Sequence, residues 1–213
     1  MTKTINIGVL GGMFDPVHNG HLRSALTALE DLGLDEMRLV PCGKPVHRRS
    51  TVASAVQRID MLSLGTAGQP QFTVDGRECL SDRPSYTYDT LAGIRSDMPG
   101  CRLFLLVGTD AFNTLPTWYR WRELFDLAHI VVMSRPGCEI GAEGPLAEET
   151  EGRMVDNVED MQACEAGKIL LYHFIPLMIA SSQIRKLIAA GRSARYLMPD
   201  SVWQYISERQ LYT

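Results

Sequence analysis

The amino-acid sequence predicts an α/β protein built on a doubly wound parallel sheet. Short apolar runs typical of strands alternate with segments in which apolar residues recur at helical spacing. Glycine-rich and polar stretches follow several of these runs, and open parallel sheets bind their ligands at the carboxyl ends of their strands. This alternation indicates a Rossmann-like fold, to which residues 181–213 add C-terminal helices.

Length and composition limit the possible classes of protein. A chain of 213 residues is long enough for one well-buried domain and short for two, so we expect a single domain over residues 1–213. The net charge of −4 argues against nucleic acid or an anionic membrane surface as the main partner. Five cysteines without a C-x-x-C pair indicate reduced thiols rather than a disulfide or zinc framework. The N-terminus lacks the apolar core of a signal peptide and no run reaches transmembrane length, so we expect a cytoplasmic protein.

The first strand and the turn after it come early in the chain. Residues 5–10 form an apolar run of strand type. Gly11 and Gly12 let the backbone bend tightly and bring its N–H groups close to a ligand. Asp15-Pro16 then redirects the chain into a helix whose N-terminus is an anion site, because its first N–H groups are unpaired and its dipole is positive there.

Two histidines stand at the start of this helix. His18 and His21 are three residues apart, which places both imidazoles on one helical turn beside the free amides. Gly20 leaves room for a phosphate next to them. We interpret this stretch as a device that binds phosphate and stabilises a transition state.

Residues 37–40 predict a second strand, which Pro41 ends. The loop that follows carries four basic side chains, Lys44, His47, Arg48 and Arg49. Such a loop is either a solvated surface or a phosphate contact. Its place at the carboxyl end of a strand favours the phosphate contact.

The next elements are a helix, a short strand and a second helix. Residues 53–64 predict an amphipathic helix, with Arg58 and Asp60 between its apolar residues. Residues 71–75 predict a strand. Ser85 is the expected N-cap of a helix that runs to Met98.

An almost unbroken apolar run over residues 101–107 predicts a central strand that is buried on both faces. It ends in Gly108-Thr109-Asp110, where a glycine and a carboxylate suit the close approach of a ribose and hydrogen bonds to its hydroxyls. The aromatic residues that follow, Trp118, Tyr119 and Trp121, are at a spacing more often found in a core than in a ligand platform.

Residues 129–133 predict another buried strand, and Arg135 after it suits either a phosphate contact or a cap on the sheet. Residues 138–167 are acidic, contain several glycines and show only weak periodicity, so we expect an insertion or a mobile surface segment without an assigned function. Residues 168–175 predict the last strand.

A second anion site is expected where the C-terminal helices begin. Ser181 and Ser182 open a helix, and Arg185 follows one turn in. A serine N-cap accounts for one serine but not for the arginine, whereas an anion clamp accounts for all three. A closing helix follows the turn at Pro199.

Two common nucleotide motifs are absent from the sequence. The glycines at positions 8, 11 and 12 do not have the G-x-G-x-x-G spacing, and no G-x-x-x-x-G-K-[ST] loop occurs. Instead, GGMFDPVHNGH resembles the G-x-F-D-P-x-H-x-G-H signature of the nucleotidylyltransferase superfamily, and within it that of the bacterial nicotinate mononucleotide adenylyltransferases. Residues 179–185 resemble the superfamily's I-S-S-x-x-I-R motif, and the likeness extends from the first strand to the last helix, except for the acidic segment 138–167.

The resemblance implies transfer of the adenylyl group of ATP to nicotinate mononucleotide, giving deamido-NAD and pyrophosphate. Mg²⁺ is expected to arrive with ATP, held mainly by phosphates and water, because the sequence contains no carboxylate cluster suited to a metal site of its own. ATP and nicotinate mononucleotide are the expected partners, nucleic acid and membranes are not, and a monomer or weak homo-oligomer is expected.

The resemblance also implies roles for particular residues. The expected catalytic residues are His18, His21 and Arg185. The expected ATP and phosphate contacts are Gly11, Gly12, Met13, Phe14, His47, Gly108, Asp110, Ser181 and Ser182. The expected contacts to nicotinate mononucleotide are Tyr86, Thr87, Trp118 and Arg135, with Trp118 stacked on the nicotinate ring.

The sequence departs from the family at Met13, where a threonine is usual, and at Ala180, where a serine is usual. Activity is expected to persist, because contacts made through backbone N–H groups survive any side chain. Three alternatives differ in how well they fit. Transfer to phosphopantetheine or glycerol phosphate would not need Tyr86, Thr87 and Trp118. An ATP-sensing module without turnover fits the departures but not the retained histidines and Arg185. A class I aminoacyl-tRNA synthetase also uses an H-x-G-H turn, but this chain leaves no room for a tRNA-binding domain.

Overall fold

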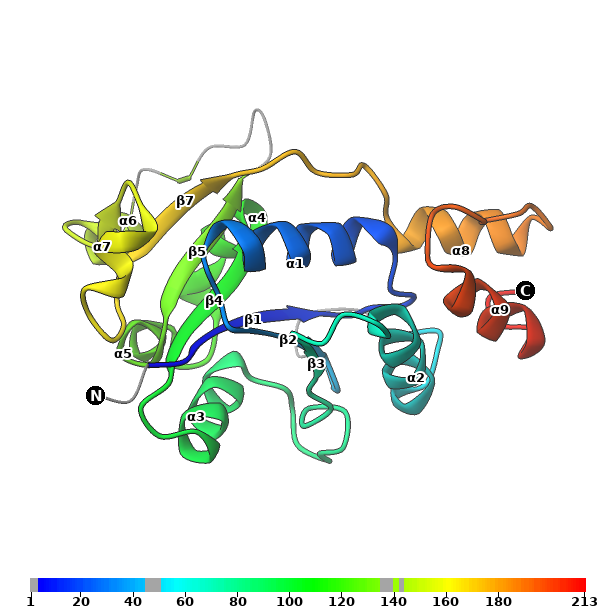
Figure 1. The fold of residues 1–213 in the computed structure, drawn as a ribbon, viewed down its shortest axis with the longest axis horizontal. Coiled ribbons are helices and arrows are strands. Elements are labelled where there is room, and N and C mark those ends of the chain that lie inside the picture. The colour runs from blue at the N-terminus through cyan, green and yellow to red at the C-terminus, as the bar shows by residue number, and fades with distance from the viewer. Residues whose placement is uncertain (1–3, 45–50, 135–139, 142–143) are drawn as a thin grey trace. The chain divides into compact units, whose positions relative to one another are not determined.

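The computed structural model of the protein describes residues 4–44, 51–134, 140–141 and 144–213. It confirms the predicted α/β fold with a parallel sheet of Rossmann type (Figure 1). The strands are β1 (Asn6–Gly12), β2 (Glu36–Pro41), β3 (Phe72–Val74), β4 (Arg102–Gly108), β5 (His129–Ser134), β6 (Met154–Val155) and β7 (Ile169–His173). Their order in the sheet is β3-β2-β1-β4-β5-β7-β6.

The helices fall between and after the strands. The longer ones are α1 (Asn19–Asp31), α2 (Ala55–Thr66), α3 (Thr87–Asp97), α8 (Ser181–Ala189) and α9 (Asp200–Glu208). The shorter ones are α4 (Thr109–Asn113), η1 (Leu115–Thr117), η2 (Trp121–Glu123), α5 (Leu124–Leu127), α6 (Pro145–Thr150) and α7 (Val158–Gln162). Within the described ranges, no helix is long and apolar enough to cross a membrane.

The chain divides into two compact units. The first comprises Met1–Gly11, Leu29–Met37 and Tyr86–Ile175. The second comprises Gly12–Ala28, Arg38–Ser85 and Pro176–Thr213. The single domain expected over residues 1–213 stays a prediction.

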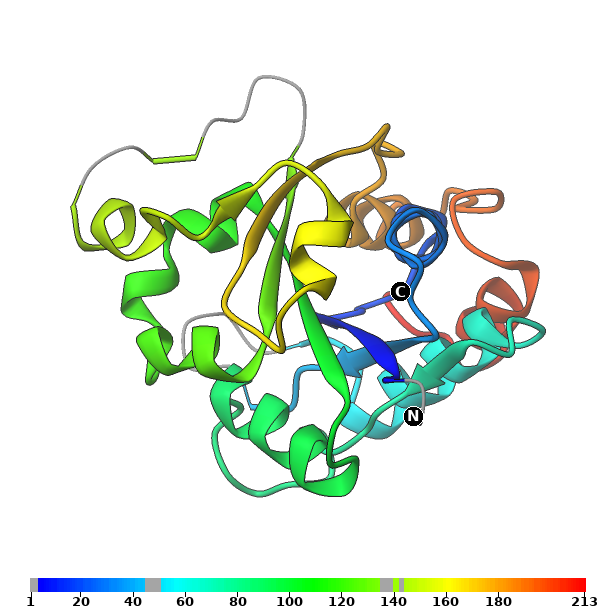
Figure 2. The same cartoon turned by 60° about the vertical axis from the view of Figure 1, so that its left-hand side comes forward.

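The core of the first unit is built on β4, β5 and β7, which run side by side in both views of the ribbon (Figure 2). All six residues of β5 are buried, as are five of the seven in β4. Their pairing is parallel, with Leu105 opposite Ile130 and Val131 opposite Leu170. Burial on both faces is the reason that these strands have nearly continuous apolar sequences.

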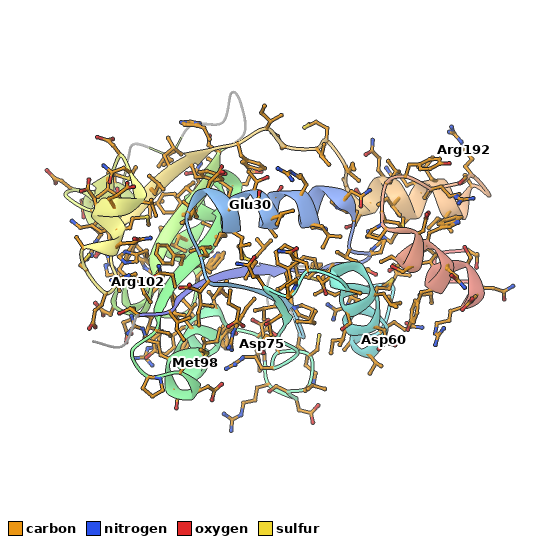
Figure 3. The ribbon with its side chains drawn as sticks, viewed as in Figure 1. Glu30, Asp60, Asp75, Met98, Arg102 and Arg192 are labelled. Carbon is orange, nitrogen blue, oxygen red and sulfur yellow. The ribbon has the colours of Figure 1, made fainter. Side chains whose placement is uncertain are left out.

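The acidic segment contains secondary structure that its sequence does not predict. Helices α6 and α7 lie within it, and β6 pairs in parallel with β7. The weak periodicity reflects the shortness of these elements. Side chains of the sheet hold the segment, since Arg102, labelled in Figure 3, donates to the carbonyls of Gln162 at 2.7 Å and Cys164 at 2.8 Å.

In the second unit, α2 packs against α9. The hydroxyl of Tyr205 on α9 donates to the carboxylate of Asp60 on α2 at 2.7 Å. Helix α2 begins at Ala55, two residues later than the predicted start. The reason is a capping box, in which Ser54 and Gln57 each bind the other's backbone N–H.

Candidate active site

The turn between β1 and α1 is held by side chains of the second unit. Arg58 Nη1 donates to the carbonyl of Met13 at 2.9 Å. Arg185 Nη1 donates to the carbonyl of Asp15 at 2.6 Å, and Ser181 Oγ to the carbonyl of Pro16 at 2.9 Å. These bonds come from α2 and α8, so two distant segments fix one short turn.

His18 and His21 lie together at the start of α1. Their rings are stacked, with centroids 3.7 Å apart and planes 22° apart. His18 immediately precedes α1, and its Nδ1 accepts a hydrogen bond from the backbone N–H of His21 at 3.4 Å. An accepting Nδ1 places the proton of a neutral His18 ring on Nε2. The edge-on ring of Phe14 lies 5.0 Å from that of His21.

Burial keeps both imidazoles neutral. It lowers the pKa of His18 from 6.5 to about 4. Burial, together with the neighbouring His18, lowers the pKa of His21 to about 3. Within the described part of the chain, His21 Nδ1 is buried without a hydrogen-bond partner.

Gly20 leaves room for the ring of His18. A Cβ at this position would lie 3.0 Å from Nδ1 of His18 and 3.2 Å from the carbonyl oxygen of Leu177. The imidazole and the Leu177 carbonyl thus approach the backbone of Gly20 closely, and the room for a phosphate that the sequence suggests stays a prediction. Glycine at this position allows His18 to fold back over the start of α1.

The carboxylate of Asp15 lies inside the unit, with the residue only 4% exposed. Oδ2 accepts from the N–H of Val52 at 2.8 Å, and Oδ1 accepts from the N–H of Ala53 at 3.1 Å. The hydroxyl of Tyr212 donates to Oδ1 at 2.7 Å. The side chain of Asp15 therefore fixes the turn to other segments.

At the start of α8, the structure separates the roles of the predicted residues. The N-cap is Ala180, which makes no side-chain hydrogen bond to the helix. The serine N-cap of the alternative interpretation does not form: Ser181 is the first residue of the helix, its hydroxyl bonds to the carbonyl of Pro16, and Ser182 is exposed. Arg185 is about one-third exposed, so its guanidinium contacts the turn and also reaches the surface.

In the first unit, the predicted residues gather at the carboxyl ends of strands. Gly11 near the end of β1 and Gly108 at the end of β4 are exposed, and a Cβ on either would meet no atom within 4 Å. Because β1 and β4 are parallel, these two ends lie at the same edge of the sheet. Asp110, in α4, is also exposed.

The residues predicted to bind nicotinate mononucleotide lie at the start of α3 and after η1. Tyr86 is the N-cap of α3, and Thr87 is its first residue. The Tyr86 ring lies 4.5 Å from that of Tyr119, which is 48% exposed, while the neighbouring Trp118 is half-buried. Tyr119 therefore joins this group, although its spacing alone suggests a core residue.

Ser85 does not cap α3 as the sequence predicts. Its hydroxyl instead accepts hydrogen bonds from the N–H groups of Gly43 and Lys44, each at 3.1 Å. Two other predicted site residues, His47 and Arg135, lie outside the described residues.

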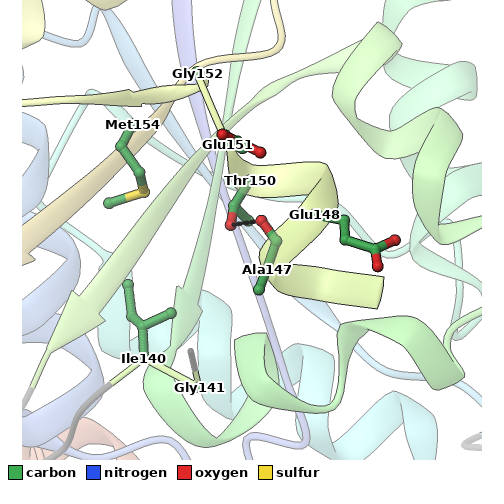
Figure 4. A pocket seen from close by; sticks show the side chains of 8 residues that line it. All are labelled: Ile140, Gly141, Ala147, Glu148, Thr150, Glu151, Gly152 and Met154. Carbon is green, nitrogen blue, oxygen red and sulfur yellow. Dashed lines mark hydrogen bonds between the residues drawn. The ribbon is translucent and has the colours of Figure 1, made fainter. Parts of the chain in front are cut away.

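A separate cavity of about 580 Å³ lies beside α6 in the first unit (Figure 4). Its lining residues are Ile140, Gly141, Ala147, Glu148, Thr150, Glu151, Gly152 and Met154. The hydroxyl of Thr150 is bonded to the carbonyl of Ala147 at 3.0 Å. None of the predicted site residues that the structure describes is among the lining residues. Across the described ranges, no three His, Cys, Asp or Glu residues are grouped to hold a metal ion.

Comparison with known proteins agrees with the family that the signature turn, residues 11–21, suggests. The cytidylyltransferase-like family matches residues 9–187. A probable nicotinate-nucleotide adenylyltransferase of Aeromonas hydrophila is 43% identical over 206 residues, covering 97% of this chain and 96% of the relative. A relative of the same description from Pseudomonas aeruginosa is 44% identical over 209 residues, with the same coverage. The chain belongs to the nicotinate-nucleotide adenylyltransferase family.

The fold is also that of solved members of this family. The nicotinic acid mononucleotide adenylyltransferase of Plasmodium falciparum, in complex with NaAD, superposes with a TM-score of 0.71 at 18% identity. The match covers 98% of this chain and 97% of that one.

Sequence reasoning missed the supporting role of three residues that hold the family's signature turn, namely Asp15, Arg58 and Tyr212. Arg58 is only 1% exposed. The sequence did contain a signal for the burial of Arg58. Residue 58 is three residues before the buried Met61 and four before the buried Leu62, so it shares their helical face. The contact between Asp15 and Tyr212, 197 residues apart, has no such local signal.

Proposed function

We propose that the protein transfers the adenylyl group of ATP to nicotinate mononucleotide, releasing pyrophosphate and forming deamido-NAD. The observation that carries the proposal is the stacked pair of neutral imidazoles at the start of α1, in a turn that Arg185 also contacts. The names of relatives at 43% and 44% identity support the same reaction.

In this reaction, an oxygen of the 5′-phosphate of nicotinate mononucleotide attacks the α-phosphorus of ATP in line. The bond from the α-phosphorus to the bridging oxygen breaks, and pyrophosphate leaves. Because the attacking group is itself an anion, no protein nucleophile is needed. The protein's task is to align two anions and stabilise the charge that develops on the phosphates.

His18, His21 and Arg185 are the proposed donors for that charge. His18 offers its Nε2–H, because its Nδ1 accepts from the amide of His21. Arg185 uses Nη1 for the carbonyl of Asp15, which leaves its other N–H groups for a phosphate. The start of α8, without a side-chain cap, adds backbone N–H groups beside Ser181 and Ser182.

Magnesium enters this proposal as part of the substrate, Mg–ATP. The described residues include no cluster of metal ligands, which suits an ion that is held by phosphates and water. Gly11, Gly12, Met13, Phe14, Gly108 and Asp110 are the proposed further contacts to ATP, with His47 as a triphosphate contact.

The pyridine nucleotide is assigned to the first unit. Tyr86 and Thr87 begin α3, where a helix N-terminus favours an anion. Trp118 is the proposed stacking partner of the nicotinate ring, and Arg135 remains a proposed contact. A cytoplasmic location and a monomeric or weakly associated state also remain predictions.

The test is pyrophosphate release with Mg–ATP and one of three acceptors: nicotinate mononucleotide, nicotinamide mononucleotide or phosphopantetheine. Fast release with nicotinate mononucleotide and little with the others supports the proposal. Faster release with phosphopantetheine would assign a different acceptor. Release with none of the three, together with measurable ATP binding, would favour an ATP-sensing module.

A further inference from the structure

The carboxylate of Asp15 belongs to the interior of the second unit and not to its surface. Two backbone N–H groups, of Val52 and Ala53, donate to it, and the hydroxyl of Tyr212 completes its set of donors. Arg185 Nη1, 3.9 Å from Oδ2, lies farther away and bonds to the Asp15 carbonyl instead. A carboxylate bonded in this way fixes the backbone that carries it.

Tyr212 is built to remain a donor in this contact. The residue is only 8% exposed. Burial, and then the hydrogen bond to Asp15, raise the pKa of its hydroxyl above the ordinary value of 10.0, so the hydroxyl keeps its proton at neutral pH. Its backbone has a φ of 66°, a left-handed conformation that few residues other than glycine adopt. Such a conformation persists where the surrounding contacts determine it.

Asp15 lies within the signature turn, between Phe14 and Pro16. Phe14, before it, packs its ring against His21, and Pro16, after it, is held by Ser181. A shift of Asp15 would therefore move the imidazole donors relative to α8. Displacements of about 1 Å in a catalytic group cost on the order of 100-fold in rate, so such a shift would be measurable as lost turnover.

We infer that Tyr212 is a positioning residue for the adenylyl transfer, acting through the Asp15 carboxylate to hold the signature turn and its histidines in place. The inference rests on the proposed function for its kinetic consequence. The structural tie itself does not depend on that function.

Tyr205 provides a matched control. Its hydroxyl also donates to a carboxylate at 2.7 Å, that of the partly buried Asp60, and Tyr205 is likewise 8% exposed. The bond joins α9 to α2 and does not contact the signature turn. Tyr212→Phe and Tyr205→Phe therefore each remove, from the same unit, one hydroxyl group that donates to a carboxylate.

The experiment compares kcat, KM for ATP, melting temperature and hydrogen exchange of the segment 12–22 in the two variants and the wild type. For Tyr212→Phe we expect a kcat about tenfold lower at a nearly unchanged KM, with faster exchange in the segment. For Tyr205→Phe we expect a similar loss of melting temperature, a kcat within about twofold of wild type and unchanged exchange in the segment.

Equal kcat values for the two variants, with equal exchange, would overturn the inference and leave Tyr212 a purely stabilising residue. A Tyr212→Phe variant that fails to fold, when Tyr205→Phe folds, would also overturn the inference. A wild-type protein that releases no pyrophosphate would refute the proposed function instead, and the exchange measurement would still decide whether Tyr212 holds the turn.

Discussion

The imidazole rings of His18 and His21 stack 3.7 Å apart, and burial keeps both uncharged in the free protein. Two stacked imidazolium rings would repel each other, which adds to the cost of removing each charge from water. A polyanion placed beside them changes this balance, because negative charge favours the protonated ring. The pair is therefore suited to take up a proton when a triphosphate arrives.

We expect ATP binding to be accompanied by uptake of up to one proton at pH 6. The free histidines have pKa values of about 4 and about 3, so both rings are neutral at this pH before ATP binds. Calorimetric titration in buffers of different ionisation enthalpy measures the number of protons taken up. His173→Ala, which removes an exposed histidine at the end of β7, should leave that number unchanged. The same uptake in a His18→Ala/His21→Ala variant would assign the proton to another group.

His21→Ala should lower kcat by a factor on the order of 10² to 10³, the range found when one donor to a developing oxyanion is removed. The melting temperature should change little, because the partly buried ring contributes an unpartnered nitrogen to the interior. Steady-state kinetics and thermal melting are the measurements, with His173→Ala as the control. Near-normal turnover would refute the catalytic role.

An element of the fold can be predicted from the sequence when the interactions that determine it are local. The strands over residues 101–107 and 129–133 were predicted to within about one residue, because burial on both faces leaves a continuous apolar run. The capping role of Ser85 was wrong, because the amides of Gly43 and Lys44, about 40 residues away, bind the same hydroxyl. Sequence rules for helix caps consider only neighbouring residues, so they cannot detect a hydrogen-bond partner that is distant in the sequence.

The candidate site likewise has features that the local sequence predicts and features that it does not. Glycine and histidine spacing predicted the turn and its two imidazoles, because both depend on neighbours within one helical turn. The supports of the turn come from α2, from α8 and from Tyr212, and only packing brings them together. The sequence pattern places Arg58 between the apolar residues of an amphipathic helix, although its position relative to Met61 indicates the buried face.

Trp118→Ala should raise KM for nicotinate mononucleotide by about tenfold while changing KM for ATP little, because stacked aromatic contacts contribute on the order of 1 kcal/mol beyond the burial of area. Trp203→Ala, which removes a half-buried tryptophan of α9, is the matched control and should leave both KM values near those of the wild type. Initial rates at varied acceptor and saturating Mg–ATP give the comparison. An unchanged KM for nicotinate mononucleotide in Trp118→Ala would remove this residue from the site.

Stability should fall as pH falls from about 6.5 to about 4, because three histidines resist protonation in the folded state. Burial lowers the pKa of His129 to about 4, alongside those of His18 and His21. In this range the unfolded chain binds protons that the folded chain does not, so lowering the pH favours unfolding. Each histidine contributes at most about 1.4 kcal/mol per pH unit, which gives a limit of about 4 kcal/mol per pH unit for the three. Above pH 6.5 this dependence of stability on pH disappears, because the histidines of the unfolded chain then also become neutral.

Urea unfolding at pH 7, 6 and 5 measures this dependence. His129 is fully buried, with its Nδ1 accepting from the N–H of Lys168 at 3.2 Å, so His129→Asn removes one titrating group at the cost of a lower overall stability. The slope of unfolding free energy against pH should then fall by about one-third, while the absolute stability falls at every pH. A slope near zero in the wild type between pH 6 and 5 would mean that the imidazoles are protonated in the folded protein. The stacked pair would then carry charge before any phosphate binds, and the proton uptake expected on ATP binding would also be absent.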